Sequence, residues 1–353
     1  MISTLDIRIE KVGQSRISEM DFHHIEFARK YSDHMFIADY DGKEWKDFRI
    51  IPYGNIEVSP ANPAIHYGQS IFEGLKAYKD EAGQVLIFRP DKNYERMNKS
   101  AERMMMPQLP RELFIDAMHE LINLDRAWVP DVEGTSLYIR PFMFATDEFI
   151  GVRPSDTYRY MIITCPVGAY YPKPVKVKIE EHFTRAVKGG TGYAKTAGNY
   201  AASLYPAWLA QQEGYDQLIW TDGQQHRYIE EAGTMNLMFM IDDTLITAPT
   251  GDTILAGVTR DSVLTLARDW GVKVEERPLE VQELLAAIKE GRLQEAFGTG
   301  TAATIAHIEA IGYRDEQYHL DLGERHFSDK VLETLDAIRT GKAEDKYGWN
   351  YRV

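Results

Sequence analysis

The stretch GGTGYAKTAGNYAAS, residues 189–203, surrounds one lysine with glycine, alanine and small polar residues. A lysine amine attacks a carbonyl carbon only after it has lost its proton, and burial favours the uncharged amine. Small neighbours also let a flat ring lie close to the backbone beside the amine. Solvated lysines beside glycines are commoner, yet Lys195 meets the requirements of a Schiff-base lysine. The stretch therefore predicts a site for an aldehyde cofactor, provided that the rest of the chain supplies partners for it.

The composition sets the class of protein. The 353 residues are 44% hydrophobic, so the chain can bury a large core. Cys165 is the only cysteine, which excludes a disulfide within the chain and favours a cytoplasmic location. The net charge of −14 disfavours a nucleic-acid partner. Residues 1–16 lack the apolar centre of a signal peptide, and no apolar run is long enough to cross a bilayer, so we expect no membrane partner.

The periodicity of apolar residues predicts an α+β protein in two parts. Short strands and turns are expected over residues 36–88, followed by helices after Pro90 and from about Pro110 to Trp128. The segment PKPVKVKIEE carries two prolines and alternating charges, as linkers do. Strands and helices then alternate again, with helices at about 200–213, 260–270, 279–290 and 328–340. The expected domains are a small N-terminal domain over 1–171, a linker over 172–182 and a larger C-terminal domain over 183–353.

Four other places in the sequence offer partners for a pyridoxal cofactor. Glu230 and Glu231 end a strand-like segment, where neighbouring side chains face opposite ways, so one of them can point inward towards a ring nitrogen. Gly257 precedes a predicted helix, whose first N–H groups and dipole attract an anion. The turn FGTGTA, residues 297–302, is suited to a nest of N–H donors. Arg96 offers a cation. Each feature alone is commoner as plain structure.

Eight segments, taken in their order along the chain, make the sequence similar to branched-chain amino acid aminotransferases, which are fold-type IV pyridoxal-phosphate enzymes. They are HYGQSIFEGLKAY (66–78), FRPDKNYERMNKSAERM (88–104), GTSLYIRP (134–141), CPVGAYY (165–171), YAKTAGNY (193–200), EEAGTMN (230–236), GVTRDS (257–262) and FGTGTA (297–302). The resemblance implies a two-domain α+β fold with a small N-terminal α/β domain, a larger C-terminal domain and the cofactor at their interface. It implies pyridoxal 5′-phosphate as the cofactor, and no metal.

The resemblance assigns cofactor roles position by position. Lys195 matches the lysine that carries the cofactor, and Arg96 matches the phosphate arginine. Glu231, rather than Glu230, matches the carboxylate that keeps the pyridine nitrogen protonated, and Tyr200 matches the tyrosine that hydrogen-bonds the ring oxygen. The expected cofactor-binding residues are Lys195, Arg96, Tyr200, Glu231, Thr234, Val258, Thr259 and Thr301.

The substrate pocket has to accept an aliphatic side chain in one half-reaction and the carboxylate of glutamate in the other. Tyr138 and Arg140 are two residues apart on an expected strand, so they share a face. Arg140 can then hold the carboxylate. In the family, Tyr67 and Val152 reach the neighbouring subunit's site, which implies a homodimer. The expected substrate-binding residues are Phe27, Tyr67, Phe72, Tyr138, Arg140, Val152, Tyr170, Thr301 and Ala302.

The implied activity is a reversible ping-pong transfer of the amino group between leucine, isoleucine or valine and 2-oxoglutarate. Lys195 would be both the covalent anchor and the proton shuttle. Two alternatives stay open. D-Amino acid aminotransferases and aminodeoxychorismate lyases share the lysine, the glutamate and the phosphate turns, but they lack Tyr138, Arg140 and Tyr170 as a set. A relative that binds the cofactor without turnover would have lost Lys195, Glu231 or Arg96, and all three are present.

Overall fold

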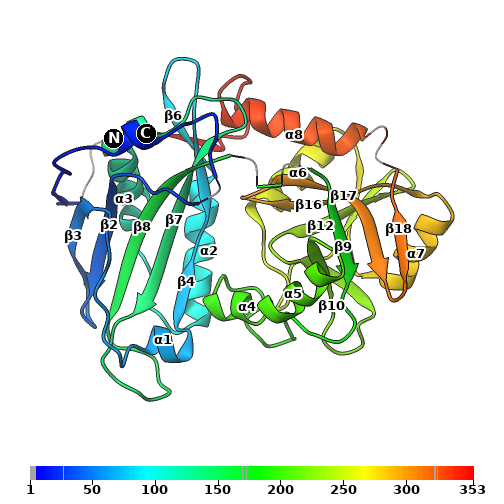
Figure 1. Ribbon diagram of the computed structural model, residues 1–353, viewed down its shortest axis with the longest axis horizontal. Helices are drawn as coiled ribbons and strands as arrows, with labels where there is room; N and C mark the ends of the chain where they lie inside the picture. The colour runs from blue at the N-terminus through cyan, green and yellow to red at the C-terminus, as the bar shows by residue number, and fades with distance from the viewer. Residues whose placement is uncertain (1–4, 27, 169, 172, 322, 324) are drawn as a thin grey trace. The chain divides into compact units, whose positions relative to one another are not determined.

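The computed structural model describes residues 5–26, 28–168, 170–171, 173–321, 323 and 325–353. The chain forms two compact units (Figure 1). The first unit comprises the described residues up to Tyr170 together with 194–197 and 336–353. The second comprises the described residues of 171–193 and 198–335. Lys195 therefore belongs to the first unit, although most of its neighbours in sequence belong to the second.

The first unit is built on one sheet with the strand order β1-β3-β2-β8-β7-β5-β6-β19, and β4 pairs with β7 beside this path. The pairs are antiparallel except for β1 with β3. β7 (Ser136–Ala145) and β8 (Tyr158–Val167) form the longest pair. The other strands are β1 (Arg8–Ile9), β2 (His34–Tyr40), β3 (Trp45–Pro52), β4 (Ser70–Phe72), β5 (Leu75–Lys79), β6 (Val85–Phe88) and β19 (Asn350–Arg352).

Two long helices pack on this sheet, α2 (Pro90–Arg103) and α3 (Arg111–Leu124). Pro90 opens α2, where a proline costs no hydrogen bond. Met97 and Ala101 of α2 and Phe114 of α3 are buried in one core with strand residues, which confirms the helical spacing expected after Pro90. The expected helix up to Trp128 ends earlier, at Leu124, and a 3-10 turn (Arg126–Trp128) follows. The remaining short elements are α1 (Pro63–Tyr67) and a 3-10 turn (Ile17–Glu19).

The second unit is built on a sheet with the order β14-β13-β12-β16-β17-β9-β10-β11-β15; β18 pairs with β17, and β12 also pairs with β11. The turn between β12 and β13 falls at Asp242 and Asp243, with φ angles of 47° and 56°. Positive φ at both positions is typical of a type I′ hairpin turn. The strands are β9 (Val175–Ile179), β10 (Gln217–Thr221), β11 (Tyr228–Ala232), β12 (Asn236–Ile241), β13 (Thr244–Thr247), β14 (Lys273–Glu276), β15 (Leu279–Glu280), β16 (Leu293–Gly300), β17 (Thr304–Tyr313) and β18 (Glu316–His319).

The helices of the C-terminal half follow the expected order. They are α4 (Ala197–Ala201), α5 (Leu204–Gln212), α6 (Val258–Asp269), α7 (Val281–Lys289) and α8 (His326–Arg339). The helix expected over 200–213 is divided, and Pro206 lies in the first turn of α5. A first-turn proline needs no N–H partner, so the division accommodates it.

The segment 172–182 differs from the expected linker, because it contains β9. This strand pairs in parallel with β17 on one side and with β10 on the other. Val175, Val177 and Ile179 are buried, so their alternation with lysines is the period of a strand and not of a solvated connection. Pro174 directly precedes the strand, where a missing N–H is tolerated.

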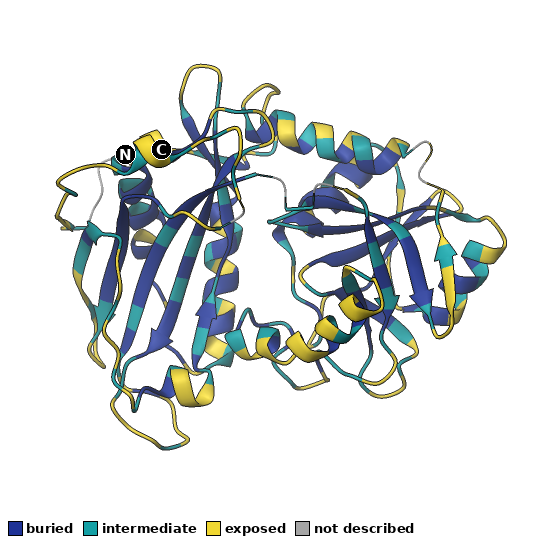
Figure 2. Ribbon diagram, viewed as in Figure 1, coloured by how far each residue is buried: buried dark blue, intermediate teal, exposed yellow. Residues whose placement is uncertain are grey.

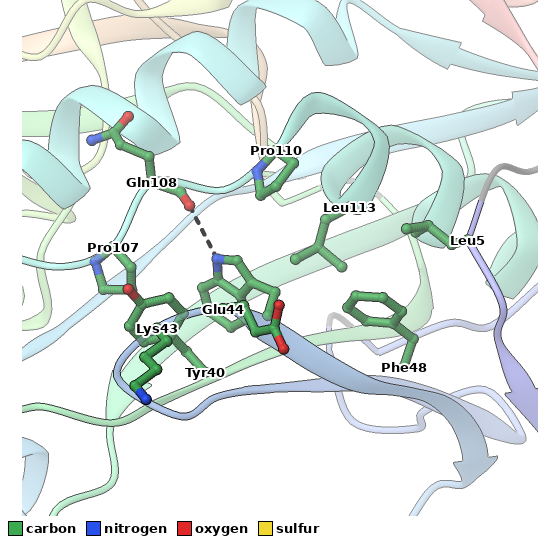
Figure 3. A pocket seen from close by; sticks show the side chains of 10 residues that line it. Leu5, Tyr40, Lys43, Glu44, Phe48, Pro107, Gln108, Pro110 and Leu113 are labelled. Atoms are coloured by element: carbon green, nitrogen blue, oxygen red, sulfur yellow. Dashed lines mark hydrogen bonds between the residues drawn. The ribbon is translucent and has the colours of Figure 1, made fainter.

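The strands of both sheets are largely buried, whereas α5 is largely exposed (Figure 2). A pocket of about 510 Å³ in the first unit is lined by aromatic side chains, including Tyr40, Trp45 and Phe48 (Figure 3). Trp45 donates from Nε1 to the carbonyl of Gln108, at 3.0 Å. This pocket is lined by none of the expected site residues. Across the part of the chain that the structure describes, no helix has the length and apolar character needed to cross a membrane.

Candidate active site

Lys195 is held by backbone contacts inside the first unit. Its N–H donates to the hydroxyl of Ser100 on α2, at 2.9 Å, and its carbonyl accepts from the N–H of Phe72, at 3.0 Å. The next residue, Thr196, forms a bridge with Ile71 of β4. The Nζ atom of Lys195 lies 4.9 Å from the centre of the Phe72 ring. The lysine is thus fixed between a helix and a strand, with its amine beside an aromatic wall.

Arg96 lies on α2 and is held by a carboxylate that the sequence reasoning did not single out. Its Nε and Nη2 atoms donate to the two oxygens of Glu73, each at 2.7 Å. Glu73 is fully buried and also accepts from Asn93, at 2.7 Å. Burial raises the pKa of the Glu73 carboxyl, but the charge and hydrogen bonds of Arg96 outweigh this, and the pKa lies below its usual value. The pair fixes the plane of the guanidinium in the manner of a two-point carboxylate contact.

The residues expected to recognise the substrate side chain meet on one face of the first sheet. Arg140 donates from Nη2 to the hydroxyl of Tyr138, at 2.8 Å, as expected from their spacing on β7. The guanidinium carbon of Arg140 lies 4.6 Å from the centre of the Phe72 ring. A Cβ on Gly74 would lie 2.2 Å from the Tyr138 hydroxyl, so only glycine leaves room for this tyrosine. Because Phe72 also contacts the amine of Lys195, these groups form one cluster.

The remaining expected substrate residues of the first unit have different surroundings. Burial raises the pKa of Tyr170, and the nearby Tyr138 phenol contributes in the same direction. Tyr67 at the end of α1 and Val152 are exposed, by 42% and 91%. Phe27 lies outside the described residues.

Glu231 is a buried carboxylate of the second unit with a charged partner. One oxygen lies 2.5 Å from Nη2 of Arg185, and the other accepts from Nδ2 of Asn236, at 3.0 Å. The side chains of Arg185 and Glu231 are only 9% and 6% exposed. Arg185 also donates to the carbonyls of Gly192 and Thr253. Neither Arg185 nor Asn236 was singled out from the sequence.

Glu230 is buried as well, but its contacts differ. One of its oxygens accepts from the hydroxyl of Thr253, at 2.6 Å. Burial raises the pKa of this carboxyl, and the Thr253 hydrogen bond opposes the shift only in part. Glu231 has a charged partner and Glu230 has a neutral one at hydrogen-bond distance. The contrast favours Glu231 as the permanently charged carboxylate of the two.

The N-terminus of helix α6 has the features of an anion-binding site. Gly257 is its N-cap, and no described side chain caps it. A Cβ on Gly257 would lie 2.0 Å from the side-chain oxygen of Asn236, so a larger residue would not fit. Asn236 also donates to the carbonyl of Leu255, at 3.0 Å, and to Glu231. One amide therefore ties the turn before Val258 and Thr259 to the buried carboxylate.

The second glycine turn joins β16 to β17. Thr301 and Ala302 lie between these strands and are partly exposed. A Cβ on Gly300 would lie 3.1 Å from the carbonyl of Thr234, which brings Thr234 next to this turn. Tyr200 lies on α4 and is partly buried. β11, which carries Glu231, and β16, which leads into this turn, both pair with β12.

These residues fit pyridoxal 5′-phosphate by the chemistry of their donors. The first unit supplies an amine and an oriented guanidinium, Lys195 and Arg96. The second supplies a buried, charge-paired carboxylate, Glu231, and a helix start at Val258 that no described side chain caps. A ring-nitrogen partner, a Schiff-base amine and phosphate donors are the groups that this cofactor needs.

Comparison with known proteins identifies the family. The profile of the family described as amino-transferase class IV matches residues 70–311. The chain is 45% identical over 352 residues to branched-chain-amino-acid aminotransferase 2 of Bacillus subtilis (strain 168), covering 98% of this chain and 97% of that protein. It therefore belongs to the class IV aminotransferases, which confirms the resemblance seen in the sequence.

Solved structures agree with this assignment. The branched-chain aminotransferase from Thermoproteus uzoniensis with norvaline has a TM-score of 0.76 at 25% identity, covering 90% of this chain and 99% of that one. The T.th. branched-chain amino acid aminotransferase complexed with N-(5′-phosphopyridoxyl)-L-glutamate has a TM-score of 0.72 at 25% identity, covering 90% and 97%. The expected fold-type IV architecture and the pyridoxal-phosphate cofactor are confirmed.

Proposed function

We propose that this chain is a branched-chain amino acid aminotransferase. It would transfer the amino group reversibly between leucine, isoleucine or valine and 2-oxoglutarate in a ping-pong cycle. The observation that carries the proposal is the cluster of Phe72, Tyr138 and Arg140 around the amine of Lys195. Aromatic walls suit an aliphatic side chain, and a guanidinium at their edge suits the second carboxylate of glutamate. The names of the relatives support the same activity.

The reactive groups divide into an anchor, an electrostatic partner and phosphate donors. Pyridoxal phosphate, when bound, supplies the electron sink that makes the Cα proton of an amino acid removable. Nζ of Lys195 would anchor the cofactor and, once released by the incoming amino acid, accept that proton. Glu231 would hold the ring N–H, and Tyr200 would donate to the ring oxygen. The proposed phosphate donors are Arg96, Thr301 and the N–H groups of Val258 and Thr259, with Thr234 beside them.

The proposed substrate groups serve both halves of the cycle. Thr301 and Ala302 would bind the α-carboxylate that every substrate shares. Arg140 would pair with the side-chain carboxylate of glutamate, with the Tyr138 hydroxyl as its hydrogen-bond partner. Tyr170 would complete the aromatic wall. The same wall accepts leucine without a new polar contact, which accounts for two substrates in one pocket.

Single-turnover rates with the holoenzyme test this function. L-Leucine, L-isoleucine, L-valine and L-glutamate should each convert the cofactor, and D-alanine should not. The spectrum of the bound cofactor reports each half-reaction directly. A fast reaction with D-alanine and a slow one with the branched-chain substrates would favour the D-amino acid aminotransferase alternative and refute the proposal.

We further propose that the protein acts as a homodimer. Isolated apolar side chains are normal on a surface, but the first unit exposes a group of them, including Tyr67, Ile65, Ile150 and Val152. A partner subunit that covers Tyr67 and Val152 would remove this surface from water. Sedimentation equilibrium should show a dimer for the wild type and a substantial monomer fraction for Val152→Lys. A monomeric, fully active wild type would contradict the proposal.

A cytoplasmic location completes the proposal. It is supported by the single cysteine, Cys165, which is buried. Burial raises the pKa of this thiol to about 11, which keeps it in its unreactive protonated form. Fractionation of the producing cell, with detection of the protein in the soluble cytoplasmic fraction, tests this location.

A further inference from the structure

A second pocket lies in the second unit, where α7, the β16–β17 hairpin and the segment before α8 meet. Its volume is about 440 Å³, within the range of small-molecule sites. Its walls include the aliphatic side chains of Ile288, Leu293 and Leu320. Among the described residues that line it, none is expected to bind cofactor or substrate. The pocket is therefore separate in its residues from the active site proposed above.

Arg325 brings a cation to this pocket. Its Nε and Nη1 atoms are buried and have no hydrogen-bond partner among the described residues. Nε lies 3.8 Å from a carboxylate oxygen of Asp329, which is beyond hydrogen-bond distance. Leaving buried N–H groups without an acceptor costs on the order of 1–3 kcal/mol each. An anionic group bound beside this guanidinium would supply an acceptor that the described residues do not.

The start of α8 is not the source of this anion preference, because a side chain already occupies it. Glu295 accepts from the N–H of Phe327, at 2.8 Å, and from the N–H of Ser328, at 2.9 Å. Glu295 itself lines the pocket and is 9% exposed. Asp321 lines it as well. The pocket thus combines one guanidinium with two carboxylates above aliphatic walls.

His307 does not add a second charge at neutral pH. Its Nε2 lies 3.1 Å from the hydroxyl of Ser328 and 3.1 Å from a carboxylate oxygen of Asp329. Burial and the charge of Arg325 both lower the pKa of this imidazole. Arg325 is then the permanent cation among the described lining residues.

The mixture of charges selects between ligand classes. A phosphate dianion would be repelled by Glu295 and Asp321, and a metal ion would be repelled by Arg325. A hydrocarbon would leave the Arg325 nitrogens without acceptors. A zwitterion with an aliphatic side chain satisfies all three features at once.

We propose that this pocket is a second ligand site, which binds an aliphatic α-amino acid in its zwitterionic form. The α-carboxylate would pair with the guanidinium of Arg325 and accept one of its unpartnered N–H groups. The α-ammonium would face the carboxylates of Glu295 and Asp321, and the side chain would pack against Ile288, Leu293 and Leu320. The inference rests on these residues alone and does not depend on the function proposed for Lys195.

Counting bound ligand in the absence of turnover tests the site. Borohydride reduction of the holoenzyme fixes the cofactor to Lys195 and stops the reaction, and L-leucine is then titrated by calorimetry. The wild type should bind one more leucine per chain than Arg325→Gln. Arg314→Gln removes an arginine whose side chain is 68% exposed and pairs with Glu181 in the same unit, and it should match the wild type. Asp321→Asn should weaken binding at the extra site several-fold, and it provides a second variant at an exposed position.

Analogues with one charge identify the ligand class. 4-Methyl-2-oxopentanoate lacks the ammonium and 3-methylbutylamine lacks the carboxylate, so each should bind the extra site at least tenfold more weakly than leucine. Equal stoichiometry in the wild type, Arg325→Gln and Asp321→Asn would overturn the proposal. Inorganic phosphate that displaces leucine at equal concentration would also overturn it, because it would indicate a plain anion site. None of these outcomes alters the half-reaction rates that test the proposed function.

Discussion

Arg140→Met should separate the two substrates of the proposed cycle. Arg140 is partly buried, contacts the Phe72 ring and donates to Tyr138 at 2.8 Å, so a glutamate carboxylate at this edge would lose most of its water. Leaving one partner of a desolvated charge pair alone costs about 2–5 kcal/mol. Because Arg140 is partly exposed, we expect a cost in the lower part of this range, about 2–3 kcal/mol. This corresponds to a roughly 30- to 150-fold slower glutamate half-reaction. Leucine presents only methyl groups there, so its half-reaction should change by less than about fivefold.

The assay is the single-turnover rate of the holoenzyme with saturating and subsaturating L-glutamate and L-leucine, together with the melting temperature. Arg159→Met is the matched control, because Arg159 lies on the neighbouring strand and its Nε pairs with Asp39 at 2.7 Å. It should lower stability slightly and leave the ratio of the two rates unchanged. Equal losses for glutamate and leucine in Arg140→Met, accompanied by a lower melting temperature, would show that Arg140 only braces the sheet.

Four other variants test three further predictions. Lys195→Ala should still bind pyridoxal phosphate but lose the absorbance of the lysine-linked cofactor and nearly all transamination, and normal turnover would rule out the mechanism. Glu231→Ala should slow removal of the Cα proton by about 10²–10³-fold, as is usual for one well-placed electrostatic partner, whereas Glu230→Ala should act mainly on stability; the reverse result would show that the neighbours were assigned wrongly. Burial lowers the pKa of Lys76 to about 7 from 10.5, and the charge of Arg339 adds to the shift. The unfolded chain then binds more protons than the folded one between these values, so Lys76 makes stability rise with pH across this window. Lys76→Met should therefore raise the urea midpoint most near pH 6.5 and least near pH 10, and a gain that does not vary with pH would contradict the assignment.

Local sequence patterns predicted most of the helices and strands. The apolar spacing after Pro90 predicted α2. The errors fell where long-range pairing decides the outcome. Residues 175–179 are a strand because β17 and β10 flank them, and neither neighbour is near them in sequence. Prolines and alternating charges indicated a linker there, and tertiary pairing overrode that local preference.

The residues of the candidate site also fall into those that a local sequence pattern predicts and those that it does not. Lys195, Glu231 and the two glycine turns were predicted because each has a distinctive local sequence, and their roles remain proposals. Tyr138 and Arg140 were placed on one face by the period of a strand, and their hydrogen bond confirms it. Glu73 and Arg185 were missed, because a lone glutamate or arginine in an ordinary segment has no local signal of burial. A search for charged residues within otherwise buried segments would have drawn attention to Glu73, which stands between Ile71 and Leu75.

The two missed residues share a role that explains why each unit buries an ion pair. A buried ion pair adds little to the stability of a fold, because the free energy needed to remove both charges from water offsets most of their attraction. If stability were the only requirement, two hydrophobic residues of similar size could take the place of the Glu73–Arg96 pair. The same holds for the Arg185–Glu231 pair. What such a replacement would remove is a fixed charge at a defined place. Glu73 holds two nitrogens of Arg96 and so sets the direction of the rest of the guanidinium, and Arg185 offsets the cost of burying the Glu231 carboxylate. In both units, then, the ion pair is better explained by the orientation and charge it maintains in the proposed active-site residue than by the stability of the fold.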